Sequence, residues 1–215
     1  MAKEPGRLAK HAKLGYFITF EGPEGSGKSS HCRLFGRYLK RKGYKVLITR
    51  EPGGTRIGER LRRLLLDTKN RDISHKSEML LYMASRAELV KDVILPALKS
   101  GKVVICDRFL DATVAYQGFG CGLDRKLIRN IGDFVTSGLK PDLTILLDMD
   151  IARGLKRSGR NDRIEKRSLE YHRRVRRGYL TIAREEPERI KIVRVKGDLN
   201  QVQEKIRKIV MENLL

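Results

Sequence analysis

The stretch FEGPEGSGKSS, residues 20–30, decides how the rest of this 215-residue sequence is interpreted. It follows a short apolar run and contains the four defining positions of the pattern G-x-x-x-x-G-K-[ST], which are Gly22, Gly27, Lys28 and Ser29. Glycines let the backbone curl so that its N–H groups face an anion, and the helix expected to begin near Lys28 adds its positive end. The stretch therefore predicts a loop that holds the phosphates of ATP. An ordinary glycine turn is the alternative, and the complete motif argues against it.

Two side chains of this loop have predicted roles of their own. Lys28 is expected to reach the β and γ phosphates, and the Ser29 hydroxyl to bind Mg²⁺, a cation that prefers oxygen ligands. Asp107 ends an apolar strand pattern and is the predicted carboxylate for the ion, with Asp148 as the competing candidate and a capping or ion-pair role as the alternative. The loop residues expected to bind ATP are Gly22, Pro23, Glu24, Gly25, Ser26, Gly27, Lys28, Ser29 and Ser30.

Apolar runs typical of buried strands alternate along the chain with segments of helical spacing. The predicted strands are residues 16–20, 45–50, 102–107, 143–150 and 190–195. Such alternation predicts an α/β fold, a three-layer sandwich in which a five-stranded parallel sheet is flanked by helices. Binding sites in these sheets lie at the carboxyl ends of the strands. The chemistry is therefore expected in residues 21–29, 50–56 and 107–118.

The composition limits the kind of protein and its partners. We expect one domain over residues 15–215, preceded by a basic tail over residues 1–14. Lysine and arginine number 47 against 26 acidic residues, a net charge of +21, which predicts an anionic partner. Three cysteines without metal-ligand spacing indicate reduced thiols. With no apolar run near the roughly 18 residues of a membrane span and no secretory stretch, a cytoplasmic protein without membrane contact is expected.

Five segments in order carry a resemblance to a known family: FEGPEGSGKSS, TREPGGT, LYMASR, DRFLDATVAYQG and LKRSGRNDRIE. Together they resemble thymidylate kinases of the bacterial type, over nearly everything from Tyr16 to the C-terminus. The resemblance implies ATP-dependent phosphorylation of dTMP to dTDP in deoxynucleotide biosynthesis, with Mg²⁺ and with a homodimeric assembly. It also favours Asp107 over Asp148, because the family has an Asp-Arg pair where Arg108 follows Asp107.

The resemblance also implies a site for the acceptor nucleotide. Guanidinium groups at strand ends or facing the cleft can bind a phosphate through two hydrogen bonds. Tyr82 is expected to stack on thymine where the family more often has Phe, Glu24 to approach the 3′-hydroxyl side, and Tyr116 to crowd the 2′ carbon. An aromatic of the core and a polar helix start are the alternatives for this region. The predicted substrate residues are Glu24, Arg50, Glu51, Tyr82, Arg86, Arg108, Thr113, Tyr116 and Gln117.

Residues 156–165 are rich in arginine around Gly159, a composition that suits a lid closing on phosphates. Because the loop of residues 20–30 contains no arginine, the resemblance implies that the lid supplies one to the transition state. Arg160 is our choice for this role, Arg163 is the alternative, and Arg157 is expected to pack on adenine. A solvated basic loop is the other interpretation. The predicted catalytic residues are Lys28, Arg108 and Arg160.

Two other functions compete with this interpretation. The charge of +21 suits a nucleic-acid-binding protein, but the basic residues are scattered and no nucleic-acid motif is present. A kinase of AMP, dCMP or a deoxynucleoside is the third possibility, and only the resemblance, through TREPGGT and AYQG, argues against it. The predicted partners are therefore the small molecules dTMP and ATP, with no specific nucleic acid.

Overall fold

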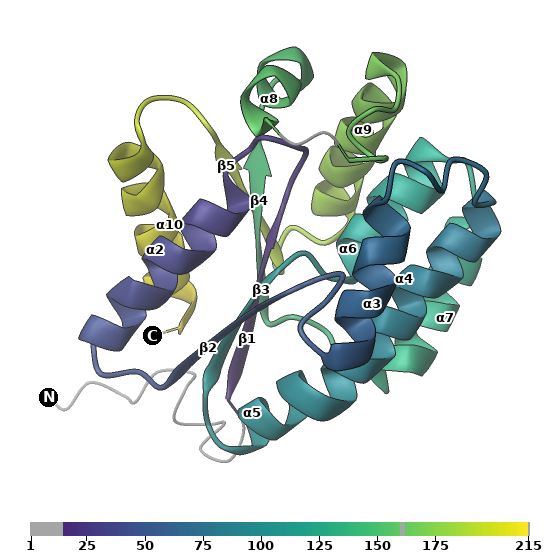
Figure 1. Ribbon diagram of the computed structural model, residues 1–215. Helices are drawn as coiled ribbons and strands as arrows, with labels where there is room; N and C mark the ends of the chain where they lie inside the picture. The colour runs from purple at the N-terminus through teal and green to yellow at the C-terminus, as the bar shows by residue number, and fades with distance from the viewer. Residues whose placement is uncertain (1–14, 160–161, 215) are drawn as a thin grey trace, which may run out of the picture.

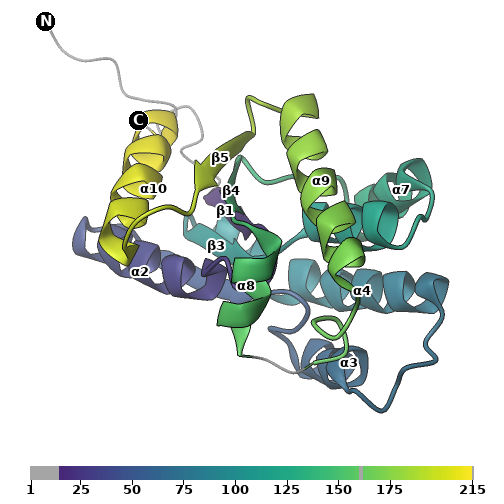
Figure 2. The same cartoon turned by 90° about the horizontal axis from the view of Figure 1, so that it is seen from above.

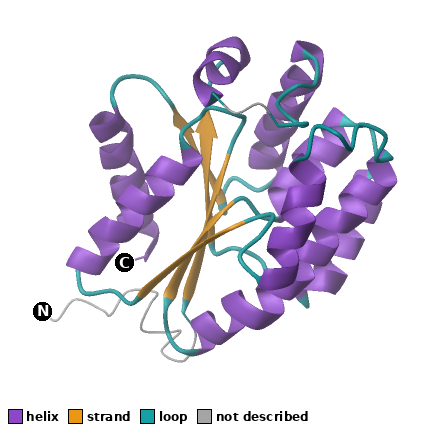
Figure 3. Cartoon of the chain, in the orientation of Figure 1, coloured by secondary structure: helices purple, strands orange, loops and turns teal. Residues whose placement is uncertain are grey.

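The computed structural model describes residues 15–159 and 162–214; the predicted tail lies outside this part of the chain. Five parallel strands form one sheet in the order β2-β3-β1-β4-β5 (Figures 1 and 3). The strands are β1 (Tyr16–Glu21), β2 (Val46–Arg50), β3 (Val103–Asp107), β4 (Leu143–Asp148) and β5 (Ile190–Arg194). The α/β fold predicted from the sequence is confirmed. The fourth strand ends two residues earlier than predicted, because the Asp150 side chain caps the next helix at the backbone N–H of Arg153.

Helices cover both faces of the sheet, and each face has its own apolar core. On one face, α2 (Lys28–Arg41) and α10 (Leu199–Leu214) pack against side chains such as Phe20, Ile105 and Ile145. On the other face two clusters form, around Phe17 and Phe109 and around Tyr116, Val175 and Tyr179. The elements of this second side are α3 (Arg56–Leu66), α4 (His75–Leu89), η1 (Val90–Ile94), α5 (Leu95–Lys99), α6 (Leu110–Thr113), η2 (Val114–Gly120), α7 (Arg125–Thr136) and α9 (Leu169–Glu185). Helix α8 (Ile151–Ser158) lies beyond the carboxyl end of β4 (Figure 1).

The register of the strands gathers the predicted site segments at one edge. In the parallel ladders Asp107 lies opposite Phe20 of β1 and opposite Arg50 of β2. Helix α8 follows β4 at the same edge, above the sheet (Figures 1 and 2). Gly25 has a φ of +70° and its α carbon faces the backbone carbonyl of Gly154 in α8, so a side chain there would be strained and would collide. The loop and α8 can therefore approach closely only because residue 25 is glycine.

Within residues 15–159 and 162–214, no helix combines the length and the apolar character needed to cross a membrane.

Candidate active site

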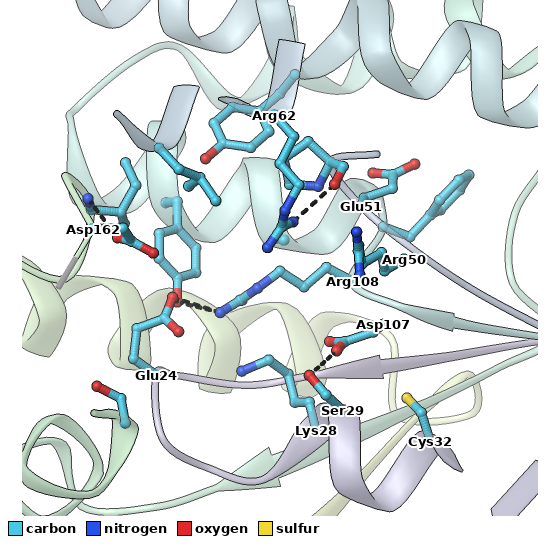
Figure 4. A pocket seen from close by; sticks show the side chains of 18 of the residues that line it. Glu24, Lys28, Ser29, Cys32, Arg50, Glu51, Arg62, Asp107, Arg108 and Asp162 are labelled. Carbon is cyan, nitrogen blue, oxygen red and sulfur yellow. Dashed lines mark hydrogen bonds and ion pairs between the residues drawn. The ribbon is translucent and has the colours of Figure 1, made fainter. Parts of the chain in front are cut away.

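A cleft of about 540 Å³ opens at the carboxyl ends of β1, β2 and β3 (Figure 4). All three segments in which chemistry was expected contribute to its wall, together with residues of α3, α4 and α8 and with Asp162, Ile164 and Glu165. A parallel sheet places its binding site at this edge because consecutive loops meet there. The cleft is large enough for a small-molecule ligand.

Lys28 is folded over its own loop at the floor of the cleft. Its Nζ donates to the Pro23 carbonyl oxygen at 2.8 Å and to Ser26 Oγ at 3.3 Å, and the residue is only 6% exposed. Burial, with the nearby charge of Arg108, lowers the pKa of Lys28 to about 8. Gly22, Pro23 and Ser26 do not line the cleft, whereas the other loop residues predicted for ATP do. The loop thus presents an ammonium group that is held in place by backbone and hydroxyl oxygens.

The two predicted metal-binding residues contact each other, since Ser29 Oγ donates to Asp107 Oδ2. The competing carboxylate, Asp148, has a different partner: it accepts hydrogen bonds from Arg176 Nε at 2.7 Å and from Arg176 Nη2 at 3.0 Å. In the described part of the chain there is no group of three or more metal-binding His, Cys, Asp or Glu side chains. The hydroxyl and carboxylate oxygens fit Mg²⁺, and nucleotide phosphates and water would have to supply its remaining ligands.

Glu24, Arg108 and Tyr116 form a hydrogen-bonded cluster inside the cleft. Glu24 Oε1 accepts from Arg108 Nη2 at 2.7 Å and from the Tyr116 hydroxyl at 2.8 Å, and Arg108 Nη2 lies 3.0 Å from the same hydroxyl (Figure 4). Burial alone would raise the pKa of Glu24, but Arg108, Lys28 and the Tyr116 hydrogen bond together lower it to about 2. The carboxylate is therefore ionised at neutral pH and fixes the Arg108 guanidinium.

Two residues behind this cluster were not found from the sequence. The Tyr179 hydroxyl of α9 donates to Glu21 Oε2 at 2.8 Å and accepts from Arg108 Nη1 at 3.0 Å, while Glu21 Oε1 accepts from the backbone N–H of Phe109 at 2.7 Å. Burial and nearby Asp111 raise the pKa of Glu21 to about 8. Arg108 adopts a φ of +73°, so these contacts hold a strained backbone. Glu21 could have been noticed as a carboxylate in an apolar strand, but no sequence signal identifies Tyr179.

Arg86 is buried and hydrogen-bonds two other predicted substrate residues, Glu51 and Thr113. Its Nη2 donates to Glu51 Oε2 at 2.6 Å and to Thr113 Oγ1 at 3.0 Å, and its Nε donates to Glu51 at 2.9 Å. Both charged residues are about as buried as core side chains, at 1% exposure for Arg86 and 5% for Glu51. Burial raises the pKa of Glu51 although Arg86 opposes it. Glu51 therefore orients Arg86, which lines the cleft beside Thr113.

The remaining predicted substrate residues differ in their surroundings. Tyr82 lines the cleft from α4, and burial raises the pKa of its hydroxyl. Gln117 lines it from η2 and donates to Glu78 at 2.8 Å. Arg50 is half-exposed and pairs with Glu59 at 3.0 Å, so its guanidinium is held at the rim. Arg62 also lines the cleft, donating to the Pro52 carbonyl oxygen at 2.9 Å (Figure 4), and was not predicted.

The three arginines considered for the lid have different positions. Arg157 is exposed on α8 and lines the cleft, as a residue that packs on adenine must. Arg160 lies outside the described residues. Arg163 is buried, donates through Nε to the Leu65 carbonyl oxygen at 2.9 Å and forms an ion pair with Glu78 at 2.6 Å. Arg163 is therefore held away from the loop that carries Lys28.

Comparisons with known proteins give one answer. The family model described as Thymidylate kinase matches residues 20–206. Thymidylate kinase from Pelobacter propionicus is 46% identical over 211 residues, which cover 94% of this chain and 96% of that protein. Thymidylate kinase from Geotalea uraniireducens is 48% identical over 189 residues, with coverage of 84% and 89%. The crystal structure of thymidylate kinase from Ehrlichia chaffeensis superimposes with a TM-score of 0.76 at 36% identity and covers 92% of this chain and 99% of that one.

Proposed function

This chain belongs to the thymidylate kinase family, whose members phosphorylate dTMP with ATP, and we propose that the cleft described above is where both nucleotides bind. The observation that carries the proposal is that one cleft is lined both by the phosphate-binding loop and by Tyr82, Arg86 and Thr113. The reaction joins the 5′-phosphate oxygen of dTMP to the γ phosphorus of ATP and breaks that atom's bond to the bridging oxygen. The products are dTDP and ADP.

The donor side of the cleft supplies positive charge and the ligands of the metal. The loop already holds the Lys28 ammonium group in place, so its charge can contact the β and γ phosphates without a large rearrangement of the side chain. Ser29 and Asp107 would hold Mg²⁺, which would neutralise charge on the same phosphates when bound. Arg157 would pack on adenine. We further propose that residues 156–165 act as a lid and that Arg160 brings a guanidinium to the transferred phosphoryl group.

The acceptor side positions dTMP. Arg108, fixed by Glu24 and Tyr179, is oriented to bind the 5′-phosphate and keep it in line with the γ phosphate. Arg86 and Thr113 present a guanidinium and a hydroxyl that can hydrogen-bond the thymine edge. Because the Tyr116 ring is buried against the cleft, a ribose 2′-hydroxyl would collide with it.

A panel of monophosphates with ATP and Mg²⁺, followed by ADP release, tests this assignment. We expect dTMP to be used far better than AMP, dCMP or the ribose form of dTMP, and we expect Tyr116→Ala to narrow the difference between the two sugars. Equal use of both sugars by the parent protein would refute the steric role of Tyr116. Preference for another base would refute the assignment of the acceptor pocket.

We also propose that the chain forms a homodimer through α4 and α7. These helices lie side by side with α3 on the outside of the molecule (Figure 1) and expose large apolar side chains: Leu80 at 51%, Leu127 at 53% and Phe134 at 84%. Sedimentation velocity should show a dimer that Phe134→Asp dissociates, whereas Leu199→Asp on the distant α10 leaves it intact. A monomeric parent protein at micromolar concentration would rule the dimer out.

A further inference from the structure

A buried carboxylate lies next to the acceptor side of the cleft without lining it. Glu78 is in the first turn of α4, is 0% exposed and sits one helical turn before Tyr82. Its Oε1 accepts from Gln117 Nε2 at 2.8 Å, and its Oε2 meets Nη2 of Arg163 and Nη2 of Arg167, each at 2.6 Å. Burying a carboxylate costs free energy unless the charge is paired. The three partners of Glu78 offset this cost.

The first partner bears on recognition of the nucleobase. A carboxylate only accepts hydrogen bonds, so Gln117 must turn its NH₂ group toward Glu78. The carbonyl oxygen of the same amide then lies on the other branch of the side chain, away from Glu78. Because Gln117 also lines the cleft, Glu78 fixes an acceptor there.

The other two partners hold a wall of the cleft. Asp162 accepts from the backbone N–H groups of Ile164 and Glu165 at 2.9 Å each, and all three residues line the cleft. This turn includes Arg163, whose backbone N–H donates to the Leu66 carbonyl oxygen at 3.2 Å. Arg167 donates in addition to Cys121 Sγ at 2.9 Å. Glu78 thus ties this turn to α4 through both arginines.

We propose that Glu78 is a positioning residue that selects the base of the acceptor nucleotide by orienting Gln117 and by fixing the turn at residues 162–167. The inference rests on the proposed acceptor site. A base that offers an N–H at its pairing edge, as thymine does, meets the Gln117 carbonyl productively. Cytosine offers a lone pair at the same position and is repelled. Discrimination between the two bases therefore depends on a residue that touches neither.

The test uses Glu78→Gln, which preserves shape and removes the charge. The new amide can accept or donate, so Gln117 is free to turn over, and both arginines lose their ion pair. We expect KM for dTMP to rise about tenfold, the size expected for a lost hydrogen bond to a charged group, while KM for ATP stays within about twofold. The ratio of kcat/KM for dTMP over dCMP should fall by a similar factor. The matched control is Glu170→Gln, which removes an exposed carboxylate that pairs with surface arginines of α9.

Hydrogen exchange gives a second measurement, and its first part uses the parent protein alone and does not depend on a variant folding. Binding of dTMP alone should slow exchange in peptides covering residues 114–120 and 162–168, and in Glu78→Gln the second peptide should lose this protection. An unchanged dTMP/dCMP ratio in Glu78→Gln, or a loss of kcat alone with lowered thermal stability, would overturn the inference. A parent protein that binds and phosphorylates dTMP but shows no protection at residues 162–168 would overturn it too. A parent protein that does not use dTMP would instead overturn the acceptor site itself.

Discussion

Lys28 combines a buried position with a charge that is needed only when phosphate binds. In the protein alone its ammonium is stabilised by two oxygens of the loop and opposed by burial, so its removal has compensating effects on stability. We expect Lys28→Ala to reduce turnover of dTMP by at least about a hundredfold, as for the loss of a charge that faces the transferred group. The melting temperature should change by only a few degrees. Near-normal ADP release by this variant would disprove the role of Lys28, and calorimetry checks its fold.

The lowered pKa of Lys28 also predicts how ATP binding depends on pH. Above pH 8 the free protein increasingly carries a neutral amine, and a bound triphosphate favours the charged form, so its pKa rises on binding. Binding therefore takes up a proton, and ATP affinity falls as the pH increases from 8 to 9.5. Titration calorimetry in two buffers of different ionisation enthalpy measures this uptake directly. The same titration of Lys28→Met is the control and should show no uptake from this group; equal uptake in both proteins would assign the proton elsewhere.

Strands could be predicted where the pattern that indicates them lies within one short stretch of sequence. The apolar runs place all five strands, and the parallel arrangement that follows from them brings Asp107 beside the loop with Ser29. Contacts between distant elements were not predictable in the same way. Tyr179 is separated from Glu21 by 158 residues, and nothing in the spacing of α9 says which face meets β1. The charge partners of buried arginines are likewise a result of packing: Glu51, which lines the cleft, also pairs with Arg86, and the sequence did not indicate this ion pair.

The segment after α8 contains two arginines, Arg160 and Arg163, for which we expect different roles. Arg163 is fixed on α3 and α4 through Leu65 and Glu78, so it shapes the cleft rather than approaching phosphate. The prediction that Arg160 serves the transition state stays open, because Arg160 lies outside the described residues. We expect Arg160→Ala to lower kcat by about a hundredfold with KM for dTMP nearly unchanged, as for a contact made mainly in the transition state. Arg163→Ala should cost less in kcat and more in KM. A larger loss of kcat for Arg163→Ala would move the catalytic role there.

At the scale of the whole molecule, part of the positive charge is used inside the fold. Arg86, Arg108, Arg163 and Arg189 are largely buried and each is paired with a carboxylate. Such arginines neutralise acids inside the fold and are not available to a macromolecular surface. The exposed lysines and arginines carry the excess of positive charge that gives the chain its net charge of +21. This charge raises the local concentration of anionic nucleotides.

This distribution predicts how the protein treats nucleic acid. Exposed lysines and arginines that are not gathered on a recognition element can contact phosphates but cannot read base edges. Duplex DNA should therefore bind weakly and without sequence preference, and the affinity should fall steeply with salt because binding releases counterions. Fluorescence anisotropy with two unrelated duplexes, between 50 and about 200 mM salt, measures both properties. An excess of ATP with Mg²⁺ should leave this binding largely unchanged, since the phosphate-binding loop takes no part in it. Submicromolar, sequence-selective binding at physiological salt would contradict the prediction and make nucleic acid a second partner of this kinase fold.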